Sequence, residues 1–163
     1  MALTRLRQYD SAAGLFDRTI ALGPSLPIGS LWSMWNELSA GQYDLAERSG
    51  RRGAEAAGLD PETYTFAIRA AADTRLRPAA LARLARIPDT VSWEFNANLR
   101  MDWLMLLGDT LGALKALERG PLGGSVYFTT SIWSPALDPL RKHPRYLAAL
   151  RLMGLPYELK ASP

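Results

Sequence analysis

One short pattern returns along this chain at an interval of 34 residues, and that interval constrains the fold more than any other feature. Tyr9-Asp10 recurs as Tyr43-Asp44, 34 residues further on, and a small residue follows at a matching place in each turn of the pattern. The positions of this small residue are Ala12, Ala46, Ala80 and Ala113. Self-similarity at about 34 residues is typical of solenoids built from antiparallel helix pairs. The sequence therefore predicts an all-α protein that offers a surface and not a reaction centre.

Helix-breaking residues stand where such pairs need their ends. They occur at Gly23-Pro24, over 58–61, at Pro88-Asp89 and at Gly120-Pro121. Between them the sequence predicts helices over 2–8, 10–22, 28–40, 43–57, 61–73, 78–86, 91–107 and 110–118. Asp60 and Asp89 are expected to cap the helices that follow them, because a carboxylate can accept from the free N–H groups of a first turn. Only Ser125 to Thr130 leans toward a strand.

The recurring alanines have a physical reason, because two antiparallel helices approach closely only where a side chain at their crossing is small. A single pair cannot bury its apolar face, so stacking must supply the core. We expect one domain over 1–163, with repeats at about 1–24, 27–60, 61–93 and 94–121, a linker over 121–133 and a cap over 134–163. Residues 1–8 supply less than half of a first helix, so we expect a fragment of a larger protein.

The repeats resemble tetratricopeptide (TPR) repeats over about residues 1–121. The matching positions are a bulky residue four after the small one, a closing proline and a glycine between paired helices: Phe16, Leu84, Leu117, Pro24, Pro121, Gly41 and Gly108. Gly50 departs from the pattern, because it replaces the bulky residue of the second repeat. The resemblance implies a TPR-like superhelix in which the first helix of each pair lines a concave groove.

The last part of the chain carries a second resemblance, through Trp133-Ser134-Pro135-Ala136-Leu137-Asp138-Pro139-Leu140-Arg141, then His143-Pro144-Arg145-Tyr146 and Met153-Gly154-Leu155. This segment looks like the end of bacterial multidomain regulators that finish in such repeats. Those proteins place an output module first, typically an OmpR-type winged-helix domain and less often a cyclase or kinase domain. As a terminal unit, the segment is expected to cover the last repeat with Trp133, Leu137, Leu140, Tyr146, Leu150 and Leu155, and Pro139 and Pro144 are expected to divide it into two short helices.

The sequence offers no catalytic residue, no metal ligand set and no cofactor site. His143 is the one histidine, and no residue of matching type stands near it, so a structural or solvent-exposed role is expected. Gly120 to Gly124 lacks the lysine and Ser/Thr of a phosphate-binding loop. The chain has no cysteine, which excludes disulfide and thiolate chemistry. We therefore expect a protein that is not an enzyme.

The charge and hydropathy of the chain limit the classes of partner that it can bind and indicate where it acts. The net charge is +3 and 16 of the 19 basic residues are arginine, but acidic residues are interleaved among them. The densest basic groups are Arg48/Arg51/Arg52, Arg83/Arg86 and Arg141/Lys142/Arg145. Nucleic-acid binding would need these groups on one face, so we interpret them as solvated helix faces and expect no direct nucleic-acid binding.

No run approaches the roughly 18 apolar residues of a membrane span. The expected location is cytoplasmic, with the periplasmic end of an inner-membrane regulator as the alternative.

We expect this chain to be a non-catalytic interaction or sensory module of a bacterial transcriptional regulator. Its expected partner is a peptide or protein, which binds in the groove lined by the first helix of each pair. The candidate partner-binding residues are Trp35, Leu38, Arg69, Asp73, Asn98 and Asp102. Arg69 can pair a peptide carboxylate and Trp35 can anchor an apolar side chain, because arginine and tryptophan dominate interface hot spots. Alternatively, Arg69 pairs with Asp73 or Asp102 and Trp35 belongs to the core.

A second hypothesis makes the chain a homo-oligomerisation or structural domain, attached to a signalling enzyme such as a cyclase or kinase. In that case a homodimer forms through the incomplete first repeat, over about 1–24.

Overall fold

In a computed structural model of the protein, helices and their short connections make up the described part of the chain. The structure describes residues 2–87, 93–118, 132 and 134–155, without the side chains of 93–99. No strand occurs within these residues, so the all-α prediction is confirmed for them. Asp89, Trp133 and the β-leaning stretch over 125–130 lie outside the described residues.

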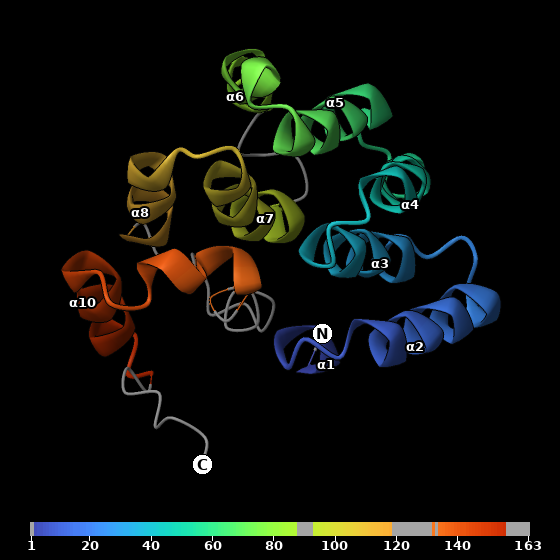
Figure 1. Ribbon diagram of the computed structural model, residues 1–163, viewed down its shortest axis with the longest axis horizontal. Helices are drawn as coiled ribbons and strands as arrows, with labels where there is room; N and C mark the ends of the chain where they lie inside the picture. Colours follow the sequence, from blue (N-terminus) through green and yellow to red (C-terminus); the bar gives the residue numbers. More distant parts are fainter. Residues whose placement is uncertain (1, 88–92, 119–131, 133, 156–163) are drawn as a thin grey trace. The chain divides into compact units, whose positions relative to one another are not determined.

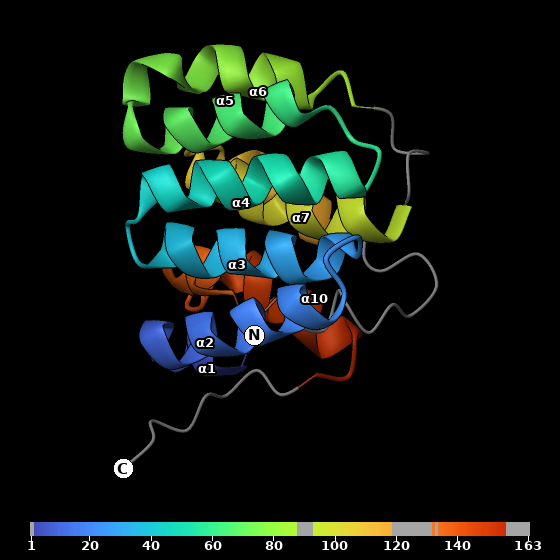
Figure 2. The same cartoon turned by 90° about the vertical axis from the view of Figure 1, so that its right-hand side faces the viewer.

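The chain divides into two compact units, Met1–Pro88 and Asp89–Pro163. The first unit contains α1 (Ala2–Arg5), α2 (Tyr9–Leu22), α3 (Pro27–Ser39), α4 (Tyr43–Ala56), α5 (Pro61–Ala72), η1 (Thr74–Leu76) and α6 (Arg77–Leu84). From α2 to α6 each helix packs against the next along the chain, and Figures 1 and 2 show them as successive layers. The array expected over 1–163 thus divides close to the predicted junction of its third and fourth repeats.

Residues with positive φ end several helices near their predicted ends. Gly41 and Gly58 adopt φ 74° and 67°, in the left-handed region that glycine enters without steric cost, and they follow α3 and α4. Helix α1 is shorter than predicted, because the chain leaves the helix before Arg7, which has φ 59°. At the start of α5, a side-chain oxygen of Asp60 accepts from the backbone N–H of Glu62 at 3.1 Å, which confirms this cap.

The small residues that recur in the sequence are buried as predicted. Ala12, Ala46 and Ala80 are 1%, 0% and 1% exposed on α2, α4 and α6. Gly50 also has a physical reason for departing from the repeat pattern. A Cβ atom there would lie 2.7 Å from Cδ1 of Ile68 and 3.0 Å from Sδ of Met34, so side chains of the two flanking helices already fill the space.

Helix α1 has only four residues, yet side-chain hydrogen bonds attach it to α3. The hydroxyl of buried Thr4 donates to Oδ1 of Asn36 at 2.9 Å. The amide nitrogen of Asn36 then donates to the backbone carbonyl of Tyr9 at 3.0 Å, where α2 begins. Asn36 therefore links three helices through atoms that would be costly to bury without partners.

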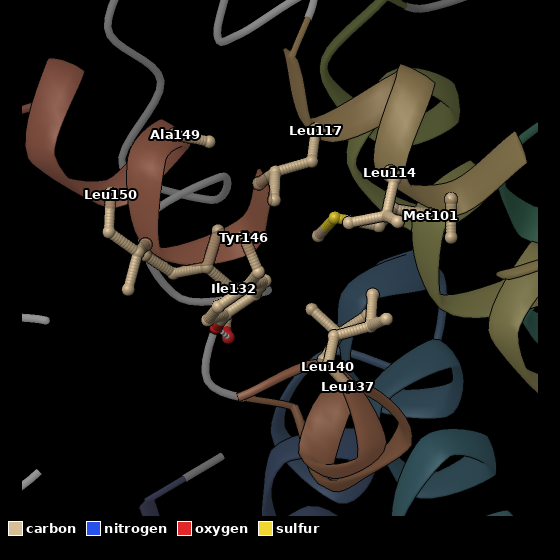
Figure 3. Packing of buried hydrophobic residues seen from close by; sticks show 10 residues of the cluster. Met101, Leu114, Leu117, Ile132, Leu137, Leu140, Tyr146, Ala149 and Leu150 are labelled. Atoms are coloured by element: carbon tan, nitrogen blue, oxygen red, sulfur yellow. Dashed lines mark hydrogen bonds between the residues drawn. The ribbon is translucent and has the colours of Figure 1, made fainter. Parts of the chain in front are cut away.

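The second unit contains α7 (Trp93–Leu106), α8 (Thr110–Glu118), η2 (Pro135–Leu140) and α10 (Pro144–Leu152). Helix α8 packs against α7 and α10, and η2 packs against α7. Buried side chains of these helices and of Ile132, which precedes η2, form one apolar cluster, drawn in Figure 3: Met101, Ala113, Leu114, Leu117, Ile132, Leu137, Leu140, Tyr146, Ala149 and Leu150. Leu155 packs partly buried against it. The described apolar residues of the closing segment thus share a core with α7 and α8, whereas its role as the cap of a repeat array stays a prediction.

Two details of this segment differ from the prediction or refine it. Pro139 lies inside the 3-10 helix η2 and does not divide two helices, whereas Pro144 begins α10 as expected. His143 has a structural role, because its Nδ1 atom accepts from the backbone N–H of Arg145 at 3.2 Å and caps α10.

Candidate partner-binding site

Arg69 on α5 is exposed, and a carboxylate on the neighbouring helix α4 fixes its orientation. Its Nε donates to Oε2 of Glu47 at 2.9 Å, and its Nη2 donates to Oε1 of the same residue. The side chain of Arg69 remains 55% exposed, against 26% for Glu47. The partner of Arg69 is thus Glu47, and the predicted pairing with Asp73 or Asp102 is wrong.

The electrostatics of this pair keep both groups charged at neutral pH. The hydrogen bond from Arg69 lowers the pKa of the Glu47 carboxyl, against the opposing effect of partial burial. The nearby charge of Arg51 lowers that pKa further, and the hydrogen bond to Glu47 raises the pKa of Arg69. Exposed ion pairs stabilise proteins by only about 0–1 kcal/mol, so the pair orients the guanidinium more than it holds the fold together.

A second ion pair joins the same two helices. Nη1 of Arg51 on α4 donates to Oε1 of Glu62 on α5 at 2.7 Å, with side chains 41% and 62% exposed. We call the four residues Glu47, Arg51, Glu62 and Arg69 the α4–α5 seam. Each helix contributes one arginine and one carboxylate, so the seam presents charges of both signs to solvent. This agrees with the interpretation of the basic group around Arg51 as part of a solvated helix face.

Asp73 lies at the end of α5, where it turns the chain into α6. Its Oδ1 accepts from the backbone N–H of Arg75 at 3.0 Å and so caps η1. Its Oδ2 accepts from Nη2 of Arg75 at 2.7 Å, and hydrogen bonding to Arg75 lowers the pKa of the Asp73 carboxyl. These contacts give Asp73 a structural role at the turn.

The other predicted partner-binding residues are less accessible. Trp35 and Leu38 on α3 are 5% and 6% exposed, which agrees with the alternative that Trp35 belongs to the core. Asp102 on α7 is 4% exposed and belongs to the second unit, and the side chain of Asn98 lies outside the described residues. Of the six candidates, the structure thus places Arg69 and Asp73 at or near the surface of one helix.

Sequence reasoning missed a buried carboxylate between α3 and α4. Glu37 is 9% exposed, and its Oε1 accepts from the hydroxyls of Ser33 and Ser49, both at 3.0 Å. Its Oε2 has no hydrogen-bond partner within the described residues. The i, i+4 spacing of Ser33 and Glu37 on a mostly apolar helix was the available signal. Because buried polar groups need their partners, the cluster fixes how α3 lies along α4.

No family model, curated protein or solved structure matches the chain. In the described ranges, no group of three or more His, Cys, Asp or Glu side chains lies together as a metal site would require. None of the described helices is both long and apolar enough to cross a membrane. The resemblance to tetratricopeptide repeats and the partner-binding roles stay predictions.

Proposed function

We propose that this chain is a non-catalytic protein–protein interaction or sensory module of a bacterial transcriptional regulator. In this proposal its helix pairs stack as a TPR-like superhelix, it acts in the cytoplasm beside an output module, and it binds a peptide or partner protein. The resemblance of the repeats supports the proposal, as does the burial of the equivalent residues Ala12, Ala46, Ala80 and Ala113 on four separate helices.

The observation that carries the proposal is the oriented, exposed guanidinium of Arg69. A guanidinium has five N–H donors, and two hydrogen bonds to Glu47 leave the others for a ligand. A planar fork of this kind suits carboxylates, which it can bind through two hydrogen bonds at once. The favoured ligand is therefore a peptide with an acidic side chain or a free C-terminal carboxylate at Arg69.

The other candidates of the first unit, Trp35, Leu38 and Asp73, have an indirect role in this proposal. Trp35 and Leu38 hold α3 within the layers of the first unit, and Asp73 orients the turn that follows Arg69. The ligand is expected to contact Arg69 and its neighbours on the α4–α5 seam.

The test is selection of a random peptide display library against the whole chain, followed by calorimetry with the selected peptide. Arg69→Ala should weaken binding of that peptide by about tenfold or more, which corresponds to about 1.4 kcal/mol. Its unfolding free energy should fall by no more than about 1 kcal/mol, because an exposed ion pair contributes little.

Arg75→Ala is the matched control, because Arg75 is also an arginine paired to a carboxylate of the first unit, with its side chain 87% exposed. It should leave peptide affinity unchanged. Equal affinity of the Arg69→Ala variant and the wild type would refute the proposed site, and a library that yields no binder would count against peptide recognition itself.

A further inference from the structure

Large apolar side chains are exposed at the first layer of the first unit. Leu15 and Leu22 on α2 are 51% and 90% exposed, and Leu6 and Leu26 on either side of the helix are 67% and 57% exposed. Half of the large exposed apolar side chains in the described part of the chain thus fall within residues 6–26. Exposed apolar side chains that gather on one face can mark an interaction surface, so this layer is a candidate for one.

Helix α2 packs against α3 through one face, where Ala12 and Phe16 are buried. Figures 1 and 2 show α2 in the outermost layer of the first unit, with α3 in the next layer. Its opposite face carries a ridge of exposed residues spaced four apart, namely Asp10, Gly14, Arg18 and Leu22. We call these four residues the α2 ridge.

The charges of the α2 ridge have no ion-pair partner in the part of the chain that the structure describes. Asp10 and Arg18 make no ion pair within the described residues. Eight residues separate them, about 12 Å along a helix, so they do not reach each other. Neither has an oppositely charged residue three or four positions away on α2, where helical ion pairs form.

We propose that two copies of this chain pair through the α2 ridge in an antiparallel, two-fold arrangement. When the α2 helices of the two copies run in opposite directions and cross at Gly14, Asp10 of each copy lies beside Arg18 of the other. The two-fold axis thus produces this charge pair twice. Ridges spaced four residues apart interlock when two helices cross at about −50°, which is the commonest packing of helices in globular proteins. The ridge therefore complements its own copy in both shape and charge.

Gly14 gives the crossing its closest point. Among the described residues, a Cβ atom at Gly14 would have no neighbour within 4 Å, so their packing does not require glycine there. A helix backbone without a side chain lets a second helix approach closely. Leu22 then extends past the first residue of α2 in the other copy, toward the segment that carries exposed Leu6.

The size of the surface predicts a weak dimer. Helix α2 has 14 residues and is about 21 Å long. One crossing of two such helices buries less than the roughly 1,200 Å² that stable interfaces need. The pairing is therefore expected only at high protein concentration, and salt should weaken it because its charge pairs lie at the surface.

Sedimentation equilibrium of the whole chain, up to millimolar concentration, tests the proposal. The wild type should show a reversible monomer–dimer equilibrium. Asp10→Arg and Arg18→Asp should each raise the dimer dissociation constant by about tenfold or more, because each change places like charges together at two symmetric contacts. The double variant Asp10→Arg with Arg18→Asp should restore dimerisation, since it exchanges the two charges.

Two further variants separate pairing from folding. Gly14→Leu should abolish the dimer and leave the melting temperature equal or higher, because the site is open in the monomer and leucine favours helix more than glycine. Arg48→Asp changes an exposed arginine of α4 and should leave the dimer intact. A monomer at every concentration overturns the proposal, and so does a dimer that survives Gly14→Leu or a double variant that fails to restore pairing. None of these outcomes depends on peptide binding at Arg69.

Discussion

At the scale of single residues, the fold depends on the alanines that allow helices to approach. Ala80 is 1% exposed on α6, whereas its neighbour Ala79 is exposed. Ala80→Leu should lower the free energy of unfolding by about 1–3 kcal/mol, because the added atoms have no space between the helices. Urea unfolding monitored by circular dichroism measures the change.

Ala79→Leu is the matched control, because it adds the same atoms on the solvent side of the same helix. It should change stability by about 0.5 kcal/mol or less. Equal stability of the two variants would show that the repeat register assigned from the sequence is wrong.

The sequence predicted which small residues are buried and which carboxylate caps a helix better than it predicted which charged side chains form ion pairs. The four recurring alanines and Asp60 follow from local requirements, since close packing needs a small side chain and a helix start needs an acceptor. The partner of Arg69 could not be predicted in the same way. Glu47 lies 22 residues away on another helix, and which side chains meet there depends on how α4 and α5 lie along each other.

At the scale of helices, three carboxylates of the first unit connect its stability to pH. Hydrogen bonds from Arg69, Thr63 and Arg75 lower the pKa values of Glu47, Asp60 and Asp73, respectively. A lowered pKa means that the unfolded chain takes up protons first as the pH falls. The stabilisation is therefore fully present above the ordinary values of 4.5 for Glu and 3.8 for Asp, and it is lost below them.

We predict that the free energy of unfolding falls as the pH drops through this range. Glu47→Gln should make the fall smaller, since glutamine takes up no proton. Urea unfolding at a series of pH values measures the effect. In an Arg69→Ala background the same substitution should have less influence, because the carboxyl has lost the hydrogen bond that lowers its pKa. An unchanged pH dependence in Glu47→Gln would contradict the assigned cause.

Helix boundaries were largely predictable because glycine and proline act locally. Gly41 and Gly108 both have positive φ and follow α3 and α7, as the repeat pattern predicted. The two errors also have local causes. The backbone of Arg7 ends α1 early in a conformation that arginine rarely adopts, and Pro139 is accommodated inside a 3-10 helix and does not end it.

At the scale of the whole molecule, the helices pack against their neighbours along the chain, and the chain divides into two compact units. The repeat pattern is continuous in the sequence from Ala80 to Ala113, yet the first unit ends at Pro88 and the second begins at Asp89. The repeated positions describe contacts between neighbouring helices, whereas a division depends on how many contacts cross a boundary. The sequence left open whether Trp35 is buried and did not predict the burial of Leu38, because a helical stripe does not show which of its faces is covered.

The last prediction concerns the closing segment of the second unit. Removing residues 134–163 takes away Leu137, Leu140, Tyr146 and Leu150, which share one apolar cluster with Met101 and with Leu117 of α8. Those two side chains would then lose apolar neighbours, because α7 loses its packing against η2 and α8 loses its packing against α10. We expect α7 and α8 to lose their protection against amide hydrogen exchange, whereas α3 to α5 keep theirs.

Hydrogen exchange followed by mass spectrometry measures both regions in one experiment. The milder substitution Leu140→Ala should reduce protection in the same two helices and destabilise the unit by about 2–5 kcal/mol, because it leaves a cavity in the same cluster. Full protection of α7 and α8 in the truncated chain would show that the closing segment does not complete their core. Loss of protection in α3 to α5 as well would show that the two units fold as one.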